Sequence, residues 1–382
     1  MAELLKDKFG PEMVHRAAQS LADVYPSFDS DGFTAMALDG FAELELTPRC
    51  RQITAAMAAY LPEDRGEAID LLAASLGPEL ENCDPDDAAP TGDAEIDDNV
   101  MSGFFYLPHG YFLADYGEGH LAKVMNANYE ITKRATSEFS IRTPLRDHTE
   151  VTLGYLEHWV HDDNCHVRRC VSEGTRPRLP WSFRLKIFQE DPTPVLALLE
   201  HLKDDPVEYV RRSVANNLND IAKDHPDVVC DVAARWWADG DATRKALIRH
   251  ALRSLIKAGE PAALDVLGYG PDSPARVGEV SLSTTSPSIG EKVKVEVVIE
   301  NPSDQPAAAL VDLVVHFVKA NGSTSPKVFK GGELELGAGE SGTIRKTISL
   351  AQHSTRKHYP GEHKIEIAIN GGNHSGGSFT LT

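Results

Sequence analysis

Long apolar runs and a regular cysteine pattern are both missing from this sequence of 382 residues. No stretch is long and apolar enough to span a membrane, and the start, MAELLKDKFGPEM, lacks the apolar core of a signal peptide. The five cysteines are odd in number, never form a CxxC pair and are absent from the last third of the chain. This usage is typical of a reducing cytoplasm, so we predict a soluble cytoplasmic protein with no membrane partner.

Positive charge is also scarce, because 38 Lys and Arg face 58 Asp and Glu, for a net charge of -20. Net charge alone speaks against nucleic acid as a partner. The charges are unevenly placed, however: residues 1–129 carry 7 basic and 24 acidic side chains, whereas residues 130–270 carry 20 and 22. Local potential decides what approaches a surface, so the middle of the chain remains a candidate for DNA binding.

A repeated motif organises this middle region. Residues 167–171 (VRRCV) return as residues 210–214 (VRRSV) and again as residues 248–252 (IRHAL). Upstream, residues 133–138 match residues 168–173, with a glutamate last in both. A period near 40 residues with helical apolar spacing is typical of HEAT-like repeats, which stack paired helices into a solenoid.

The repeat predicts which side chains become neighbours, because equivalent positions project from adjacent helices whose axes lie roughly 10 Å apart. Glu138 and Glu173 should lie side by side. Asn216 occupies the equivalent position in the next repeat, and Asp220 follows one helical turn later on the same face. Three carboxylates should therefore converge beside a ladder of cations, namely Lys133, Arg168, Arg211 and Arg249.

The same spacing allows a purely structural interpretation of these charges. Most carboxylates on helix faces only form ion pairs, and Glu138 and Glu173 could each simply pair with an arginine. Arginines of HEAT-like stacks also form hydrogen bonds between repeats, which is the alternative for Arg168 and Arg211.

Residues 175–181 (TRPRLPW) interrupt the helical pattern, since two prolines close together end a helix and favour an extended segment. The segment carries Arg176, Arg178 and Trp181 out of the helical register. Core packing is the usual role of a tryptophan, but Trp181 follows a proline in an Arg-rich break. A role at the surface is therefore an equal alternative for Trp181.

The N-terminal part has helical apolar spacing over residues 11–80, with helix N-caps expected at Asp29 and Asp64. Residues 82–99 form an acidic loop whose carboxylates lack the spacing of a calcium-binding loop. The aromatic residues 101–120 indicate a buried helix joint. The alternative places one of three side chains at the rim of a concave face: Tyr111, Tyr116 or Glu118.

Beyond a linker at residues 268–274, the apolar period changes to two, as in residues 292–297 (KVKVEV) and 364–367 (KIEI). Turn signals include the pairs 321–322 and 331–332. About seven short strands predict an immunoglobulin-like β-sandwich. The fold class is therefore an all-α HEAT-like solenoid in residues 1–270 and an all-β sandwich in residues 271–382.

The sandwich region offers no metal site by sequence. Its histidines, among them His353, His358, His363 and His374, have no ligand spacing. A basic turn with Arg356 and Lys357 is a candidate for phosphate contact, although a charged turn is often only solvated.

Three segments resemble a known family. Residues 132–142 (TKRATSEFSIR), 167–181 (VRRCVSEGTRPRLPW) and 209–226 (YVRRSVANNLNDIAKDHP) resemble bacterial DNA alkylation repair glycosylases of the AlkC/AlkD superfamily of HEAT-like-repeat proteins. The added sandwich is similar to the AlkC branch. The part before Gly110 is the least motif-like, and no role carries over to it.

The resemblance implies an N-glycosidic hydrolase that acts on duplex DNA and starts base excision repair. Its substrates would be cationic alkylated bases such as 3-methyladenine and 3-methylcytosine, removed without base flipping. By motif match, the implied catalytic residues are Glu138, Glu173 and Asp220, with Arg169, Arg176 and Trp181 beside the DNA backbone. Charge and position add further candidates for DNA binding: Lys133, Arg134, Arg168, Arg178, Arg211, Arg212, Arg249, Arg356 and Lys357.

Physical chemistry agrees with this implication. Cleavage of an N-glycosidic bond passes through an oxocarbenium-like sugar, which carboxylates stabilise while one of them orients a water. A cationic base is already a good leaving group, so we expect the reaction to need no metal and no organic cofactor. We also expect the protein to be a monomer. The alternatives are a non-catalytic HEAT-repeat scaffold and a protein that binds damaged DNA without cutting it.

Overall fold

A computed structural model describes residue 6 and residues 9–83, 104–270, 273–352 and 357–382. The chain divides into two compact units. The first comprises Met1–His225 with Asp241–Ala251, and the second comprises Pro226–Gly240 with Leu252–Thr382. The second unit thus contains helices as well as strands, and the boundary expected near residue 270 stays a prediction.

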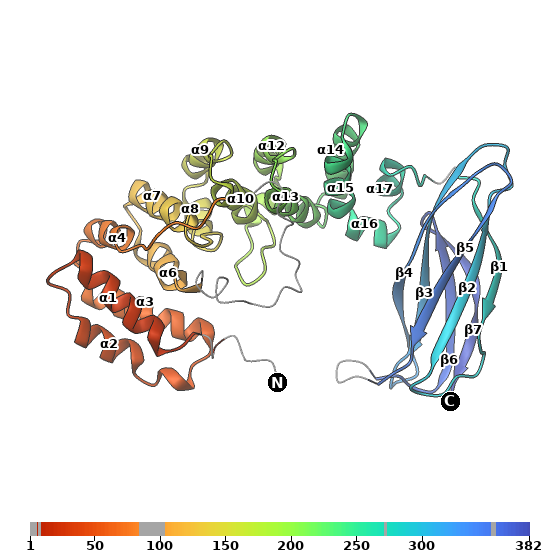
Figure 1. The fold of residues 1–382 in the computed structure, drawn as a ribbon, viewed down its shortest axis with the longest axis horizontal. Helices are drawn as coiled ribbons and strands as arrows, with labels where there is room; N and C mark the ends of the chain where they lie inside the picture. The colour runs from red at the N-terminus through yellow and green to blue at the C-terminus, as the bar shows by residue number, and fades with distance from the viewer. Residues whose placement is uncertain (1–5, 7–8, 84–103, 271–272, 353–356) are drawn as a thin grey trace. The chain divides into compact units, whose positions relative to one another are not determined.

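The first unit is helical throughout (Figure 1). Two of its predicted helix starts are confirmed: the Asp29 carboxylate accepts a hydrogen bond from the backbone N–H of Gly32, and Asp64 accepts one from Glu67. The helices are α1 (Pro11–Val24), α2 (Ser30–Leu38), the short 3-10 turn η1 (Phe41–Glu43), α3 (Leu46–Tyr60), α4 (Arg65–Ala74), α6 (Leu107–Tyr116), α7 (Leu121–Thr132), α8 (Arg142–Asp147), α9 (Thr149–Trp159), α10 (Cys165–Gly174), α11 (Lys186–Glu190), α12 (Thr193–Leu202), α13 (Glu208–Ile221) and α15 (Ala242–Ala251).

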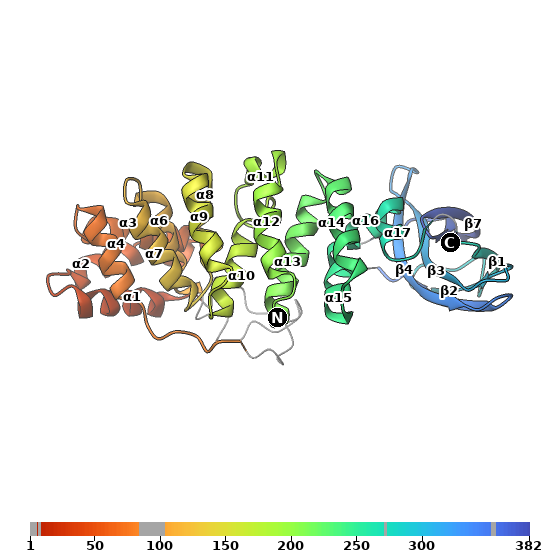
Figure 2. The same cartoon turned by 90° about the horizontal axis from the view of Figure 1, so that it is seen from above.

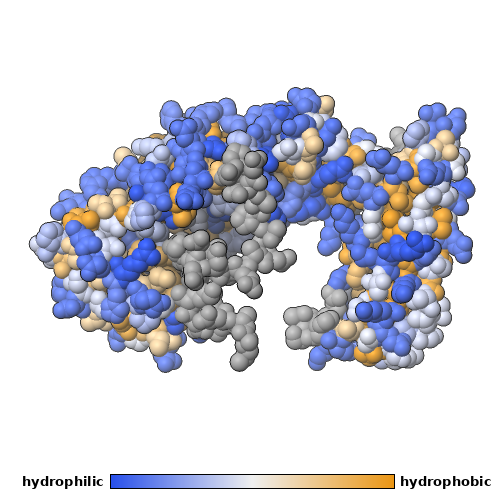
Figure 3. All heavy atoms as spheres, viewed as in Figure 1, coloured by the Kyte–Doolittle hydropathy of each residue, from blue (hydrophilic) through white to orange (hydrophobic). Residues whose placement is uncertain are grey.

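These helices stack in sequence order, as HEAT-like repeats do (Figures 1 and 2). The pairs α3–α6, α4–α7, α10–α13 and α13–α15 are in contact. The N-terminal helices share one apolar core that includes Phe33, Ile53 and Phe112, and the predicted aromatic joint lies partly within it. The visible surface over this unit is mainly hydrophilic with small hydrophobic patches, because the stack buries the apolar faces (Figure 3).

The repeat predicted from sequence corresponds to real neighbours in one part and fails in another. Residues 167–171, 210–214 and 248–251 lie on α10, α13 and α15, and α13 contacts both of the other helices. In contrast, α7 ends at Thr132, so residues 133–138 form a turn and not a helix. The Ser137 hydroxyl donates to the carbonyl of Asn128 at 3.1 Å, which satisfies a carbonyl near the helix end.

The second unit joins short helices to two antiparallel sheets. Tyr269 fastens the helical segment to the strands, since its hydroxyl donates to Glu333 Oε2 at 2.7 Å. The helices are α14 (Pro226–Ala238), α16 (Arg253–Ala258) and α17 (Pro261–Val266). The strands are β1 (Arg276–Leu282), β2 (Lys292–Glu300), β3 (Ala307–Val318), β4 (Thr324–Leu336), β5 (Ser341–Ser349), β6 (Gly361–Ile369) and β7 (Gly372–Leu381).

The predicted immunoglobulin-like sandwich is confirmed. Its sheets have the orders β1-β2-β5 and β4-β3-β6-β7. Alternation along β2 buries Val293, Val295, Val297 and Ile299 in the core and leaves the intervening side chains more exposed, which is the period of two seen in the sequence.

One predicted turn is wrong. Gly331 and Gly332 lie within β4, where the register with β3 shifts between Val311 and Asp312. A Cβ atom on Gly331 would come within 2.3 Å of the carbonyl oxygen of Val311. The two glycines therefore allow a β-bulge with close backbone approach, a use of glycine that resembles a turn signal in sequence.

Of the sandwich histidines named above, His358 and His363 are buried and His374 is exposed. His363 is fully buried and stacks on Phe379 with ring centroids 5.0 Å apart. His353 lies outside the described residues. Over the described ranges, no helix has the length and apolar character required to cross a membrane.

The cysteines depart from the expectation of a fully reduced chain. Cys83 and Cys165 form a disulfide across a sequence separation of 82 residues. The thiols of Cys50, Cys170 and Cys230 are free and buried. Apart from Asn82 and Cys83, the predicted acidic loop at residues 82–99 lies outside the described residues.

Candidate active site

The structure brings the three predicted carboxylates together in the first unit. Glu138 lies in the turn between α7 and α8, Glu173 near the end of α10, and Asp220 near the end of α13. All three are buried. Because α10 and α13 are packed together, residues far apart in sequence form one continuous chain of ion pairs.

Arg169 joins the first two carboxylates. Its Nη1 atom lies 2.7 Å from Glu138 Oε2, and its Nη2 atom lies 3.8 Å from Glu173 Oε2. The Thr136 hydroxyl donates a further hydrogen bond of 2.8 Å to Glu138 Oε2. The Arg169 guanidinium also lies over the ring of Tyr209, 4.9 Å from its centroid, so its plane is held by charge and by the aromatic face.

Arg176 joins the second and third carboxylates. Its Nη1 atom lies 2.5 Å from Glu173 Oε1, and its Nε atom lies 2.8 Å from Asp220 Oδ2. Lys223 Nζ approaches the other oxygen of Asp220 at 2.8 Å. The predicted backbone-contact residues Arg169 and Arg176 therefore alternate with the predicted catalytic carboxylates in this structure.

Ser213 is a member of the site that the sequence did not identify. Its hydroxyl donates to Glu173 Oε2 at 2.6 Å from the facing side of α13. The repeat aligns Asn216 with Glu173. The Asn216 Oδ1 atom instead lies 3.1 Å from Nε2 of His250. A signal was present in the sequence, since Ser213 replaces the buried Cys170 of the preceding repeat and so places a hydroxyl where that repeat has a thiol.

Glu173 is ionised at neutral pH. Burial by itself would raise the pKa of Glu173, but the positive charges of Arg169 and Arg176 and the hydrogen bond from Ser213 outweigh it and lower the pKa below its ordinary value. A carboxylate in this state can stabilise positive charge and accept a hydrogen bond from water. It is a poor proton donor near pH 7.

A buried arginine that the sequence also missed shapes the loop after α10. Arg142 Nη1 donates to the carbonyls of Gly174 at 2.9 Å and Arg176 at 2.7 Å, and Nη2 donates to the carbonyl of Phe183 at 2.5 Å. These bonds hold both ends of the segment that carries Trp181. Burial lowers the pKa of Arg142 to about 10, which still leaves it charged at neutral pH.

Trp181 lies within this loop and is 79% exposed, so it does not pack in the core, and its role at the surface stays a prediction. Its φ of 63° is in the left-handed region, which a non-glycine residue adopts only when the surrounding structure demands it. Trp181 and Phe183 line a cavity of about 380 Å³ together with Tyr111, Phe139 and Arg146. The turn that holds Glu138 borders the same cavity through Thr136 and Ser140.

The predicted cation ladder is largely engaged in contacts within the protein. Lys133 Nζ lies 2.7 Å from Glu79 and 3.1 Å from Glu130. Arg134 pairs with Glu130 at 2.8 Å. Both cations lie at the end of α7, where the chain after α4 passes, and they hold that segment against the repeats.

Two further members of the ladder follow the structural alternative. Arg168 Nε lies 2.6 Å from Asp205 Oδ2, which joins α10 to the loop before α13. Arg211 Nη1 donates to the carbonyl of Pro206 at 2.7 Å. Arg178 is likewise paired, with Nη2 2.6 Å from Asp224 Oδ1.

The remaining predicted cations differ in their surroundings. Arg212 lines a cavity of about 540 Å³ with His250 and makes no hydrogen bond or ion pair among the described residues. Arg249 is exposed on α15, and Lys357 is exposed after β5. Arg356 lies outside the described residues. The roles of all these residues toward DNA stay predictions.

The chain is similar to known proteins in sequence and in fold. Residues 276–382 match the family model described as the C-terminal Ig-like domain of uncharacterised protein YhaZ. The chain is 32% identical to protein YhaZ of Bacillus subtilis (strain 168) over 368 residues, which is 96% of each chain. It also matches the alkylpurine DNA glycosylase AlkC of Pseudomonas fluorescens, bound to DNA containing an abasic site analog, with 35% identity, full coverage of both chains and a TM-score of 0.82.

Helical repeats, a buried carboxylate and arginine network and an appended Ig-like sandwich define a HEAT-like-repeat protein of the AlkC/AlkD superfamily. Within that superfamily the chain belongs to the AlkC branch, to which its resemblance in sequence had assigned it.

Proposed function

We propose that this protein is a DNA glycosylase that hydrolyses the N-glycosidic bond of alkylated bases in duplex DNA and so starts base excision repair. The observation that carries the proposal is the likeness to AlkC over the whole length of both chains. The network of Glu138, Glu173 and Asp220 supports the proposal on chemical grounds, because the network concentrates anionic groups in one buried place.

The carboxylates act on the sugar. As the bond to the base breaks, positive charge develops on the deoxyribose, and anionic oxygens held in place before the reaction stabilise it. Arg169 and Arg176 keep the oxygens of Glu173 oriented and anionic. One carboxylate of the three also orients the water that attacks the anomeric carbon.

The substrates are bases that alkylation has made cationic, such as 3-methyladenine and 3-methylcytosine. A neutral base needs a proton before it can leave, and the lowered pKa of Glu173 makes that residue a poor source of one at neutral pH. A cationic base leaves without protonation. Glu173 is therefore suited to the departure of a cationic base and not to the protonation of a neutral one.

Excision proceeds with the base left in the duplex. Trp181, exposed at the tip of its loop, packs against the deoxyribose beside the lesion, and Arg169 and Arg176 lie next to the backbone. The sandwich contributes backbone contacts through the basic turn with Arg356 and Lys357. The protein acts as a monomer in the cytoplasm, and the reaction draws on its own carboxylates.

Release of a free base from DNA tests the proposal. Duplexes carrying 3-methyladenine or 3-methylcytosine are incubated with the purified protein, and released bases are separated by chromatography. Free methylated base and abasic DNA are expected, with none from unmodified duplex or from a duplex carrying a neutral lesion. Binding of alkylated DNA without any base release would instead establish a damage-binding protein and overturn the glycosylase proposal.

Base flipping is tested on the same substrates. A fluorescent purine analogue next to the lesion brightens when its stacking partner leaves the helix. Fluorescence that stays low during a complete turnover supports excision from the stack. A burst of fluorescence before release would contradict it.

A further inference from the structure

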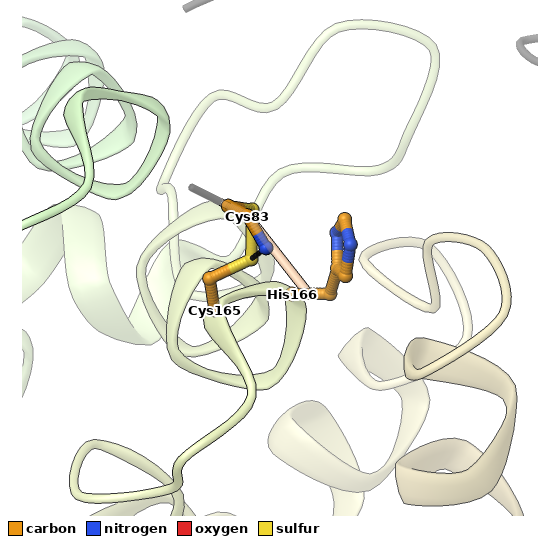
Figure 4. Close-up of side chains that lie close together, drawn as sticks. All are labelled: Cys83, Cys165 and His166. Atoms are coloured by element: carbon orange, nitrogen blue, oxygen red, sulfur yellow. Dashed lines mark hydrogen bonds between the residues drawn. A yellow bond between two sulfur atoms is a disulfide. The ribbon is translucent and has the colours of Figure 1, made fainter. Parts of the chain in front are cut away.

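A cluster of metal-ligating side chains lies outside the carboxylate network. Cys83, Cys165 and His166 each offer one ligand atom, and these atoms lie within 4.8 Å of one another (Figure 4). Cys83 follows α4 in the chain, whereas Cys165 and His166 are the first two residues of α10. No spacing rule in the sequence could pair them, which is why the sequence predicts no metal.

The segment that carries Cys83 is anchored at the same place by polar contacts. Asn82 Oδ1 accepts a hydrogen bond from the backbone N–H of Cys165 at 2.9 Å, and Asn82 Nδ2 donates to the carbonyl of Asp163 at 3.0 Å. The backbone N–H of Cys83 lies 3.2 Å from Cys165 Sγ. These contacts do not depend on the bond between the two sulfurs, so they would keep the thiols close after reduction.

The position of Cys165 favours its thiolate. Cys165 is the first residue of α10, and Asn164 caps that helix by accepting from the N–H of His166 at 2.8 Å. Helix N-termini stabilise negative charge, and thiolate is the form of cysteine that binds metal ions.

His166 follows Cys165 directly in the chain and is partly buried beside the two sulfurs. When one ring nitrogen of a histidine forms a hydrogen bond, the other can bind a metal ion. The Nε2 atom lies 3.2 Å from the carbonyl oxygen of Glu81, the kind of contact that orients metal-bound histidines in proteins.

We propose that, with both thiols reduced, Cys83, Cys165 and His166 bind one divalent cation of the Zn²⁺ class. Two thiolates and an imidazole are the ligands that such an ion prefers, and they leave the fourth tetrahedral position to solvent. Partial exposure of Cys83 and His166 agrees with a solvent ligand.

The disulfide and the metal site are two states of the same pair of sulfurs. A dithiol reductant supplies two electrons and two protons to the Cys83–Cys165 bond and becomes a disulfide itself. The two thiols then lose their protons to solvent as the cation binds. In either state residues 81–83 stay tied to the start of α10, the helix that carries Arg169 and Glu173.

Cobalt titration of the reduced, full-length protein tests this site. After reduction and removal of the reductant under argon, Co²⁺ should bind one equivalent with a thiolate-to-cobalt absorption band, and Zn²⁺ should displace it. Cys83→Ser, Cys165→Ser and His166→Gln should each weaken binding by about tenfold or more. Cys230→Ser, which removes a buried thiol elsewhere, should bind like the wild-type protein.

A second measurement uses only the wild-type chain. Alkylation followed by mass spectrometry should show Cys83 and Cys165 protected in reduced protein with Zn²⁺ and modified after chelation. Cys50, Cys170 and Cys230 should behave the same in both samples. Reduced protein that takes up no Co²⁺, a cobalt spectrum that survives the three substitutions, or unprotected thiols would each overturn the metal site.

Discussion

Ser213 on α13 donates a hydrogen bond of 2.6 Å to the carboxylate of Glu173 on α10. Both residues are buried, so the bond joins two neighbouring repeats at the centre of the carboxylate network. It helps to keep Glu173 anionic and fixes the direction of one of its oxygens.

Replacement of Ser213 by alanine should therefore damage both stability and excision. Loss of the hydrogen bond leaves a buried anionic oxygen less satisfied and should lower the free energy of unfolding by about 1–3 kcal/mol. The excision rate should fall as well. Ser172→Ala is the matched control, because Ser172 Oγ is buried on α10 and has no hydrogen-bond partner among the described residues. Urea unfolding and single-turnover excision of both variants check this, and equal behaviour of the two would contradict it.

The three carboxylates should contribute unequally to excision. Glu173→Gln and Asp220→Asn should keep DNA binding and lose most of the excision rate, whereas Glu138→Gln should lose less. Glu173 and Asp220 share Arg176, while Glu138 lies at the end of the network. Single-turnover rates and binding constants are compared, with Glu157→Gln, an exposed residue of α9, as control. Wild-type rates in all three variants would refute the carboxylate mechanism.

Low pH should remove the stability that Glu173 contributes. Its pKa in the folded protein is lowered, so its contribution is present above the ordinary pKa of 4.5 and is lost as the pH falls through the folded value. The difference in unfolding free energy between wild type and Glu173→Gln should be constant from pH 7 to about 5 and shrink below 4.5. Denaturant unfolding at several pH values measures it. A difference that grows on acidification has the wrong sign for this account.

Trp181→Gly should separate stability from activity. Glycine adopts the observed φ of 63° freely, and Trp181 buries little, so stability should be kept or raised by about 1 kcal/mol. Excision should nevertheless drop, because the exposed ring no longer meets the sugar. Thermal unfolding and excision rates are measured on one preparation. Trp236→Gly is the contrast, since that tryptophan is buried and its loss should destabilise strongly. Unchanged excision by Trp181→Gly would remove the proposed contact.

Candidate DNA-binding cations should affect DNA binding differently from Arg168, which is paired with Asp205 within the protein. Arg212→Gln, and Arg356→Gln combined with Lys357→Gln, should each reduce the slope of log affinity against log salt by roughly 0.9 for every phosphate that is no longer neutralised. Arg168→Gln should leave the slope unchanged and lower stability by about 3 kcal/mol, because it leaves Asp205 buried without its partner. Binding is measured over a range of salt. The assignment fails if Arg168→Gln alone changes the slope.

Substitutions are a better probe of the sandwich than truncation near residue 271. The helical segment before it belongs to the same compact unit as the strands, and Tyr269 bonds to Glu333 within that unit. Removal of the strands would expose this segment, so a loss of activity in the truncated protein could not be assigned to DNA contact.

Local patterns in the sequence determined the fold class, and together with the family resemblance they singled out three carboxylates that the structure brings into one ion-pair network. The apolar period of β2 gave a strand, Asp29 and Asp64 gave helix starts, and the repeat gave the contacting helices α10, α13 and α15. Each of these signals lies within one element or between copies of one motif. A pattern of that kind is readable without knowing which segments meet.

Only the tertiary structure decided which partner each polar group has. Ser213 meets Glu173, Arg168 meets Asp205 and Cys83 meets Cys165 across separations of about 40 to 80 residues. Stacking of the repeats and the course of the chain after α4 create these pairs. A charge in a sequence shows neither its burial nor its partner, and both must be known to separate a cation that can meet DNA from one already neutralised within the protein.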